Sequence, residues 1–242
     1  MPTEAGRHPT EDPDRGTRRD ADEAADAPFS ERLKRATWSA HEDAEQHGFS
    51  RALLEGALPR ESYAAMVAQH YFAYAALEEV GRSLAADPVA GRVVHPELFR
   101  VPALERDLTA LYGADWRERI APTAPTRAYT ERIERTAEDP AGYVAHHYTR
   151  YLGDLSGGQF IRRVAERAYG LDQRGGTAFY DFSALGSLPR FKARYRAQLD
   201  ALELELDAAA REHVVDETRL AYRLNMAVLA DLGASFAADA AV

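Results

Sequence analysis

Three glycines and one acidic residue are concentrated in a short segment, Tyr151–Gln159, whose flanking pattern is helical. Inside a helix each glycine costs about 1 kcal/mol relative to alanine, so the cluster needs a physical reason. Gly153 and Gly157 are four residues apart and therefore share one helix face. A face without side chains can serve close helix packing, or it can let a flat ligand approach the backbone. Asp154 favours the ligand, because a buried acid is costly unless it hydrogen-bonds water or takes part in chemistry.

The eight histidines of the chain include one candidate metal ligand. None has glutamate three residues before it, and no His-Glu-x-x-His motif occurs, which argues against a multi-histidine metal site. His41 lies on an apolar helical stripe, with Glu45 one turn later on the same face. One ring nitrogen could bind a metal while the carboxylate orients the other. The pattern alone favours a core histidine with Glu45 in solvent, and it predicts packing or surface roles for His146 and His147.

The periodicity around these residues predicts helices throughout and no strand. Ser30 can cap the first helix and Gly48 can end it. Asp139 and Pro140 start the helix that carries the glycines, and Gly170 ends it. Further helices are expected from Pro59 to near Pro88, over 103–112, over 126–136, from Pro189 and from about Ala208. We therefore expect an all-α fold, a single-domain bundle of seven to nine helices.

Composition excludes several functional classes. With no cysteine among 242 residues, the chain has no disulfide, zinc finger, iron–sulfur cluster or thiolate-ligated haem. A net charge of −9 argues against a basic surface that binds nucleic acid. The chain has no apolar run of about 18 residues and no secretion signal, so we expect a soluble cytoplasmic protein. Residues 1–27 are predicted to be a disordered tail, 28–235 a helical domain and 236–242 a flexible end.

Two segments together resemble one known family. Residues 33–45, which contain His41 and Glu45, resemble the proximal helix of haem oxygenases, and residues 145–159 resemble the distal-helix signature of that family. The similarity covers roughly residues 29–233, with further matching stretches in order at 74–79, 104–108, 191–196 and 224–225. The resemblance implies a haem sandwiched between a proximal and a distal helix.

The resemblance also implies roles for the matching residues at the iron. His41 would be the proximal iron ligand, and Glu45 would orient its second ring nitrogen. The distal wall would be formed by Gly153, Gly157 and Gly158. Asp154 would hold a water network beside that wall, supported by Tyr74, Arg150 and Asn225.

A second group of matching residues would contact the haem propionates, namely Lys34, Tyr148, Lys192 and Arg196. The sequence departs from the family at Trp38, where a basic residue is common, so one propionate contact is expected to be missing or replaced. Tyr222 stands where phenylalanine is expected.

The activity that the resemblance implies is oxidative cleavage of haem b, which is both cofactor and substrate, to biliverdin, carbon monoxide and ferrous iron. The reaction uses O2 and electrons from an external ferredoxin or flavoprotein reductase. Iron release from haem is the expected physiological role, by analogy. The alternative is a non-catalytic haem carrier or gas sensor. Asp154 favours the enzyme, because a carrier needs no acid on the glycine helix.

Overall fold

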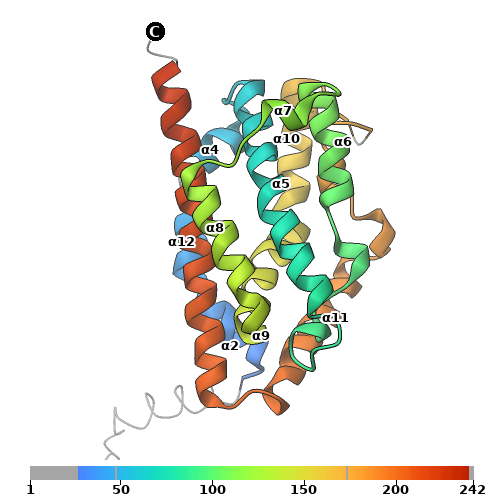
Figure 1. The fold of residues 1–242 in the computed structure, drawn as a ribbon, viewed down its shortest axis with the longest axis vertical. Helices are drawn as coiled ribbons and strands as arrows, with labels where there is room; N and C mark the ends of the chain where they lie inside the picture. The colour runs from blue at the N-terminus through green and yellow to red at the C-terminus, as the bar shows by residue number, and fades with distance from the viewer. Residues whose placement is uncertain (1–26, 47, 173, 240–242) are drawn as a thin grey trace, which may run out of the picture.

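Eleven α-helices, α2 to α12, form the part of the chain that the computed structural model describes, residues 27–46, 48–172 and 174–239. They pack into one bundle with no strand among those residues, which confirms the all-α prediction (Figure 1). The bounds are α2 Phe29–Ala36, α3 Trp38–Gln46, α4 Gly48–Glu55, α5 Arg60–Ser83, α6 Val101–Tyr112, α7 Trp116–Arg119, α8 Ala124–Arg135, α9 Pro140–His147, α10 Gln159–Tyr169, α11 Leu188–Ala201 and α12 Ala208–Asp239. The predicted N-terminal tail lies outside the described residues, apart from Ala27.

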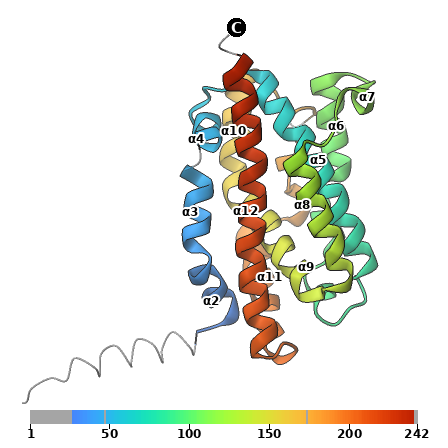
Figure 2. The same ribbon diagram turned by 60° about the vertical axis from the view of Figure 1, so that its left-hand side comes forward.

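The long helix α12 organises the bundle. It packs against α8 and α9 on one side and against α3 and α4 on the other, as Figure 2 shows. Between α8 and α6 runs α5, which buries Tyr63, Met66, Tyr74 and Leu77 in the core. The helix α12 continues to Asp239, beyond residue 235, where the sequence predicts the end of the domain.

The first predicted helix is divided into α2 and α3, and the helix α4 that follows it was not predicted. Thr37 ends α2 with φ −112° and ψ 6°, and its hydroxyl donates at 2.8 Å to a carbonyl one turn earlier, a contact that competes with regular helix. The prediction that Gly48 ends a helix is wrong. Gly48 begins α4 and is not among the glycines with positive φ, the conformation that terminates helices. The predicted cap at Ser30 is also wrong, because α2 begins at Phe29 with Pro28 at the cap position. Ser30 lies in the first turn, where its backbone N–H donates to the Asp200 carboxylate at 2.8 Å.

The glycine-bearing helix forms where it was predicted, but its middle is not α-helical. An Asp139 oxygen accepts a first-turn backbone N–H at 2.9 Å, and Gly170 ends the helix with φ 66°. Between α9 and α10 the backbone forms two π-helical segments, η4 Tyr148–Leu152 and η5 Asp154–Gly158, one on each side of Gly153. π-Helical turns are rare and occur frequently at functional sites. The helix is therefore widened at the cluster of glycines.

A buried ion-pair network joins α8, α9 and α12. Glu217 is 4% exposed. Its Oε2 lies 2.6 Å from Arg132 Nη2, and its Oε1 lies 2.8 Å from His146 Nε2. Burial by itself would raise the pKa of Glu217, but the hydrogen bonds with His146 and Arg132 outweigh burial and lower the pKa to about 2. The folded state therefore favours the charged carboxylate.

We expect Glu217→Gln to lower the free energy of unfolding at neutral pH by about 1.5–3 kcal/mol, the range for a hydrogen bond to a charged group. Because the pKa is depressed on folding from 4.5 to about 2, this contribution is complete above pH 4.5 and is lost as the pH falls toward 2. Urea unfolding of both proteins over a pH series measures the difference. A difference that stays constant from neutral pH to acid would contradict the assigned pKa.

Candidate functional site

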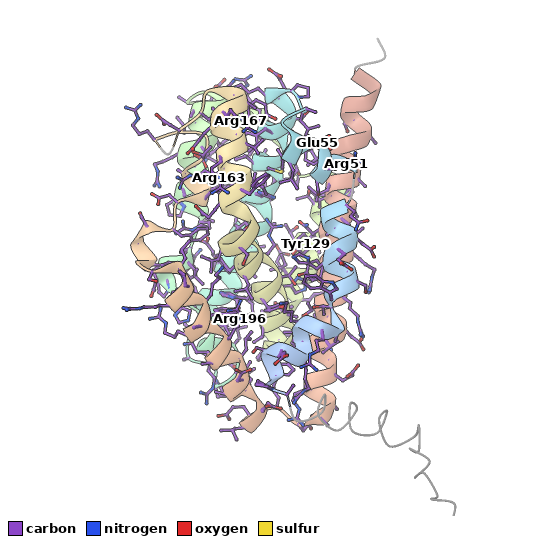
Figure 3. All side chains as sticks on the ribbon, turned by 180° about the vertical axis from the view of Figure 1, so that it is seen from behind. Arg51, Glu55, Tyr129, Arg163, Arg167 and Arg196 are labelled. Atoms are coloured by element: carbon purple, nitrogen blue, oxygen red, sulfur yellow. The ribbon has the colours of Figure 1, made fainter. Side chains whose placement is uncertain are left out.

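One large cavity lies between the helices that carry the predicted site residues. It has a volume of about 640 Å³ and is walled by α2–α4, by the two π-helical segments and by α10, with further residues from α5, α11 and α12. Figure 3 shows α2–α4 and α10 beside one another on this face of the bundle. Ten predicted site residues line the cavity: Lys34, His41, Tyr148, Arg150, Gly153, Asp154, Gly157, Gly158, Arg196 and Asn225.

Two predicted site residues that the structure describes are not part of the cavity wall. Tyr74 and Lys192 are described but do not line it. The side chain of Glu45 lies outside the part of the chain that the structure describes, so its role beside His41 stays a prediction.

His41 lies on α3, half-buried, in an aromatic environment. Its ring stacks on Trp38, with ring centroids 5.4 Å apart and planes at 11°, and Tyr222 of α12 meets it edge-on at 6.0 Å. Trp38 also contacts Lys34, whose Nζ lies 5.4 Å from the centroid of the Trp38 ring. Trp38, the residue that departs from the family pattern, thus packs on the imidazole. These contacts restrict the orientations that the His41 ring can adopt.

Asp154 is the centre of a connected polar cluster. The Tyr74 hydroxyl donates to the Asp154 carboxyl. Arg150 donates to Asn225 Oδ1 at 2.6 Å, and its guanidinium lies 4.9 Å from the centroid of the Tyr74 ring. Burial raises the pKa of Asp154 well above its ordinary value. The carboxyl can therefore retain a proton at a pH where an exposed aspartate is ionised.

The glycines of the wall have two different functions in the structure. A Cβ atom at Gly153 or Gly157 would find no side chain or neighbouring segment within 4 Å, so both positions face open space. A Cβ atom at Gly158 would lie 2.8 Å from Tyr180 Cδ1, so this glycine permits close packing. The two interpretations left open by the sequence, a ligand groove and close packing, therefore both hold, at different positions.

Cationic side chains stand at the cavity and at its edge. Lys34 and Arg196 line it and are exposed, and Figure 3 labels Arg196 on α11. Lys192 Nζ lies 3.5 Å from the hydroxyl of Ser156, which does line the cavity. The buried Tyr148 lines the wall next to these charges. This set suits a ligand that carries carboxylate groups.

Sequence reasoning did not single out two polar residues of the wall, His70 and Tyr180. A signal for His70 was available, because it lies four residues after Met66 and four before Tyr74 on one face of α5. Tyr180 has no local signal. The loop before it is held by Asp107, whose carboxylate accepts three backbone N–H groups at 2.7 to 2.8 Å, so its position depends on a long-range contact.

Known proteins resemble this chain both in sequence and in structure. A family profile described as "Heme oxygenase" matches residues 27–231. The chain belongs to the haem oxygenase family. Heme oxygenase 1 of Nostoc sp. is 40% identical over 205 residues, which cover 84% of this chain and 85% of the relative. The solved structure of heme oxygenase-1 from the cyanobacterium Synechocystis sp. in complex with heme has a TM-score of 0.84 and 36% identity, and the match covers 89% of this chain and 96% of that one. Heme oxygenase from Leptospira interrogans has a TM-score of 0.80 and 32% identity, with 85% and 100% covered.

The residues of the cavity fit the haem that this family degrades. Gly153 and Gly157 leave a wall without side chains, against which a flat macrocycle can lie. His41 on α3 supplies an imidazole, the residue type that holds haem iron in many proteins. Lys34 and Arg196 place positive charge at the cavity, which suits a ligand that carries carboxylates, as haem does.

Two glycine substitutions distinguish the wall from its support. We expect Gly157→Leu to prevent haem binding, because its side chain enters the open space, while urea unfolding of the haem-free protein changes little. We expect Gly158→Ala to destabilise the haem-free protein by about 1–3 kcal/mol, because the added methyl overlaps Tyr180. Haem titration by absorbance and urea unfolding measure the two effects. Equal loss of stability in both variants would show that Gly157 does not face open space.

Proposed function

We propose that this chain cleaves haem oxidatively to biliverdin, carbon monoxide and ferrous iron, using O2 and external electrons. The observation that carries the proposal is the placement of an acid, Asp154, on a glycine wall of the same cavity as His41. A haem carrier or gas sensor needs the imidazole and the space. It does not need a carboxyl with a raised pKa.

His41 would hold the iron, and Lys34, Tyr148 and Arg196 would hold the propionates, with Lys192 at the edge of the cavity. Bound haem supplies the iron that activates oxygen and the porphyrin carbon that is oxidised. A neutral imidazole gives less electron push toward O–O cleavage than a thiolate does. These cationic side chains would bind the haem carboxylates and so orient the haem in the cavity.

The protein's chemical contribution is the handling of protons at Asp154. Its carboxyl accepts a hydrogen bond from the Tyr74 hydroxyl, and burial keeps its pKa high. Arg150 stacks over the Tyr74 ring and is held by Asn225, so the hydroxyl is fixed in place. Gly153 and Gly157 add no side-chain acid of their own. Protons can therefore be delivered from Asp154 through water in the cavity.

A basic face suggests where an electron donor binds. Arg163 and Arg167 on α10 and Arg196 on α11 are exposed on the face shown in Figure 3, although the chain has a net charge of −9. A ferredoxin or flavoprotein reductase with an acidic surface is the partner that this charge favours. Over the described residues no helix is both long and apolar enough for a membrane span. A cytoplasmic location and a role in iron release stay predictions.

Turnover with hemin tests the proposal directly. Purified protein is mixed with hemin, and reductant and O2 are added with catalase present. We expect a Soret band that forms and then decays while biliverdin and carbon monoxide appear. A Soret band that persists without either product would instead identify a carrier or sensor.

Binding can be measured separately through Trp38, which lines the cavity, whereas Trp116 is 2% exposed and packs on Tyr71. In a Trp116→Phe variant we expect haem to quench the remaining emission in proportion to occupancy. The matched Trp38→Phe variant reports the signal from the distant tryptophan alone.

A further inference from the structure

His70 is a second imidazole in the wall of the cavity, and no role has yet been assigned to it. It lies on α5, whereas His41 lies on α3. Its Nδ1 atom is sealed from solvent, and none of the described residues offers this atom a hydrogen-bond partner. Buried polar atoms in folded proteins are almost always hydrogen-bonded, to protein or to ordered water. The other ring nitrogen, Nε2, is not sealed and has no hydrogen bond with the described residues, so it is the atom of His70 that water or a ligand in the cavity can reach.

The surroundings of His70 keep its ring neutral. The ring lies 6.4 Å from that of Tyr74, edge-on, and 5.4 Å from that of Phe179. Burial lowers the pKa of His70 well below its ordinary value, and the positive charge of Arg150 lowers it further. A neutral imidazole has one N–H donor and one acceptor nitrogen, so it can both donate to and accept from water.

Tyr180 supplies a second unengaged polar atom in the same wall. Its hydroxyl is buried and has no hydrogen-bond partner in the described part of the chain. Its ring contacts Phe179 at 4.8 Å, the same ring that packs on His70. Burial raises the pKa of Tyr180, and the negative charge of Asp154 raises it further, so the phenol stays protonated and within the field of that carboxylate.

These contacts place His70 beside the Asp154 cluster. Tyr74, one turn along α5, contacts the His70 ring and donates to Asp154. Tyr74 on the same helix contacts the His70 ring, and the charge of Arg150 on η4 lowers its pKa. Asp154 on η5 and Tyr180 on the loop helix η6 (Ala178–Tyr180) line the same cavity. A cavity lined by several such donors and acceptors can hold ordered water, which needs two to four polar partners.

We propose that His70 is a positioning residue that binds and orients cavity water next to Asp154 through its Nε2 atom. The proposal rests on the proposed function, because the water that it orients is the water through which Asp154 would deliver protons. It assigns His70 no bond to iron.

The tautomer and charge of His70 can be measured without haem. We expect ¹⁵N spectra of the ring nitrogens in the haem-free protein to show a neutral imidazole throughout the range from about pH 5 to 8, where free histidine titrates. A His70 that titrates like free histidine in this range overturns the proposal.

His70→Leu removes the polar nitrogens with little change in volume, and His70→Gln keeps a polar atom near the position of Nε2. His95→Leu is the matched control, because it removes an imidazole that bonds Gln198 outside the cavity. Circular dichroism and urea unfolding establish that each variant folds. We expect His70→Leu to unfold at an unchanged or higher urea concentration, because it removes an unsatisfied polar group.

Carbon monoxide bound to the reduced haem complex is the probe, because its C–O stretching frequency responds to hydrogen-bond donors in the cavity. We expect His70→Leu to shift this band to higher wavenumber, His70→Gln to return it toward the wild-type value, and His95→Leu to leave it in place. An unchanged band in His70→Leu overturns the proposal. It is equally overturned if the ferric wild-type complex has a bis-imidazole spectrum that His70→Leu loses, since His70 would then be an iron ligand. Failure of the proposed function would give a different result. The wild type would then form no biliverdin, whether or not the C–O band shifts in the variants.

Discussion

Replacement of His41 by alanine is expected to abolish biliverdin formation. The variant should lose more than about 100-fold in turnover, the upper end of the loss produced when even an outer partner of a metal ligand is removed. The reason is geometric, because His41 carries the imidazole that α3 contributes to the cavity, and Trp38 and Tyr222 hold its ring. Added imidazole should restore part of the activity by entering the space that the side chain leaves. The measurements are biliverdin absorbance and the position of the Soret band.

His213→Ala is the matched control, because His213 is exposed and contacts only Asp139 among the ion pairs of the described residues. It should retain wild-type turnover and the wild-type Soret band. If His41→Ala formed biliverdin at the wild-type rate without added imidazole, His41 could not be the iron ligand. His70, the other imidazole of the wall, would then be the first alternative to examine.

The helix that carries Gly153, Gly157 and Gly158 shows what can be predicted from neighbouring residues alone. Asp139 and Gly170 mark its two ends correctly, because capping depends on side chains and φ values within one turn. The two π-helical segments around Gly153 could not be predicted in this way. Weak helix propensity at glycine allows widening of the helix, but packing against distant segments, such as the Tyr180 contact at Gly158, determines where it occurs.

The prediction of one continuous first helix was wrong for a related reason. Its periodicity is nearly continuous, yet the Thr37 hydroxyl bonds back to the helix backbone, and the Ser30 amide is taken by Asp200 far along the chain. The Asp200 contact is not visible in a window of neighbouring residues, and the Thr37 bond, although local, does not by itself end a helix, because Thr218 makes the same bond inside α12. The division matters for the site, because it lets α3 leave the direction of α2 and present Trp38 and His41 to the cavity.

In the candidate site, the sequence identified which residues belong to the site better than which residues contact one another. The resemblance selected Tyr74, Arg150, Asp154 and Asn225 as one group, and the structure connects them through two hydrogen bonds and a cation–π contact. It could not show that Trp38 stacks on His41, since that residue departs from the family pattern. It also did not reveal His70, whose helical stripe reads as an ordinary apolar core.

Substitution of Asp154 separates haem binding from haem cleavage. We expect Asp154→Ala to bind haem with a wild-type Soret band and to lose biliverdin formation by about 10²–10⁴-fold, the usual contribution of a general acid. Asp154→Asn should behave alike, because an amide keeps the size and polarity of the side chain but cannot release a proton. Unaltered turnover in both variants would remove Asp154 from the mechanism.

The pH dependence of turnover gives a second test of the role of Asp154. Burial raises the pKa of Asp154, so the protonated, active carboxyl should be lost only as the pH rises through that elevated value, and activity should fall on the alkaline side. The Tyr74 hydroxyl donates to this carboxyl and stabilises its charged form. Tyr74→Phe should therefore raise the pKa of Asp154 and move the alkaline limb of the activity profile to higher pH. A limb that moves to lower pH, or a limb that Asp154→Asn retains, would mean that another group supplies the proton.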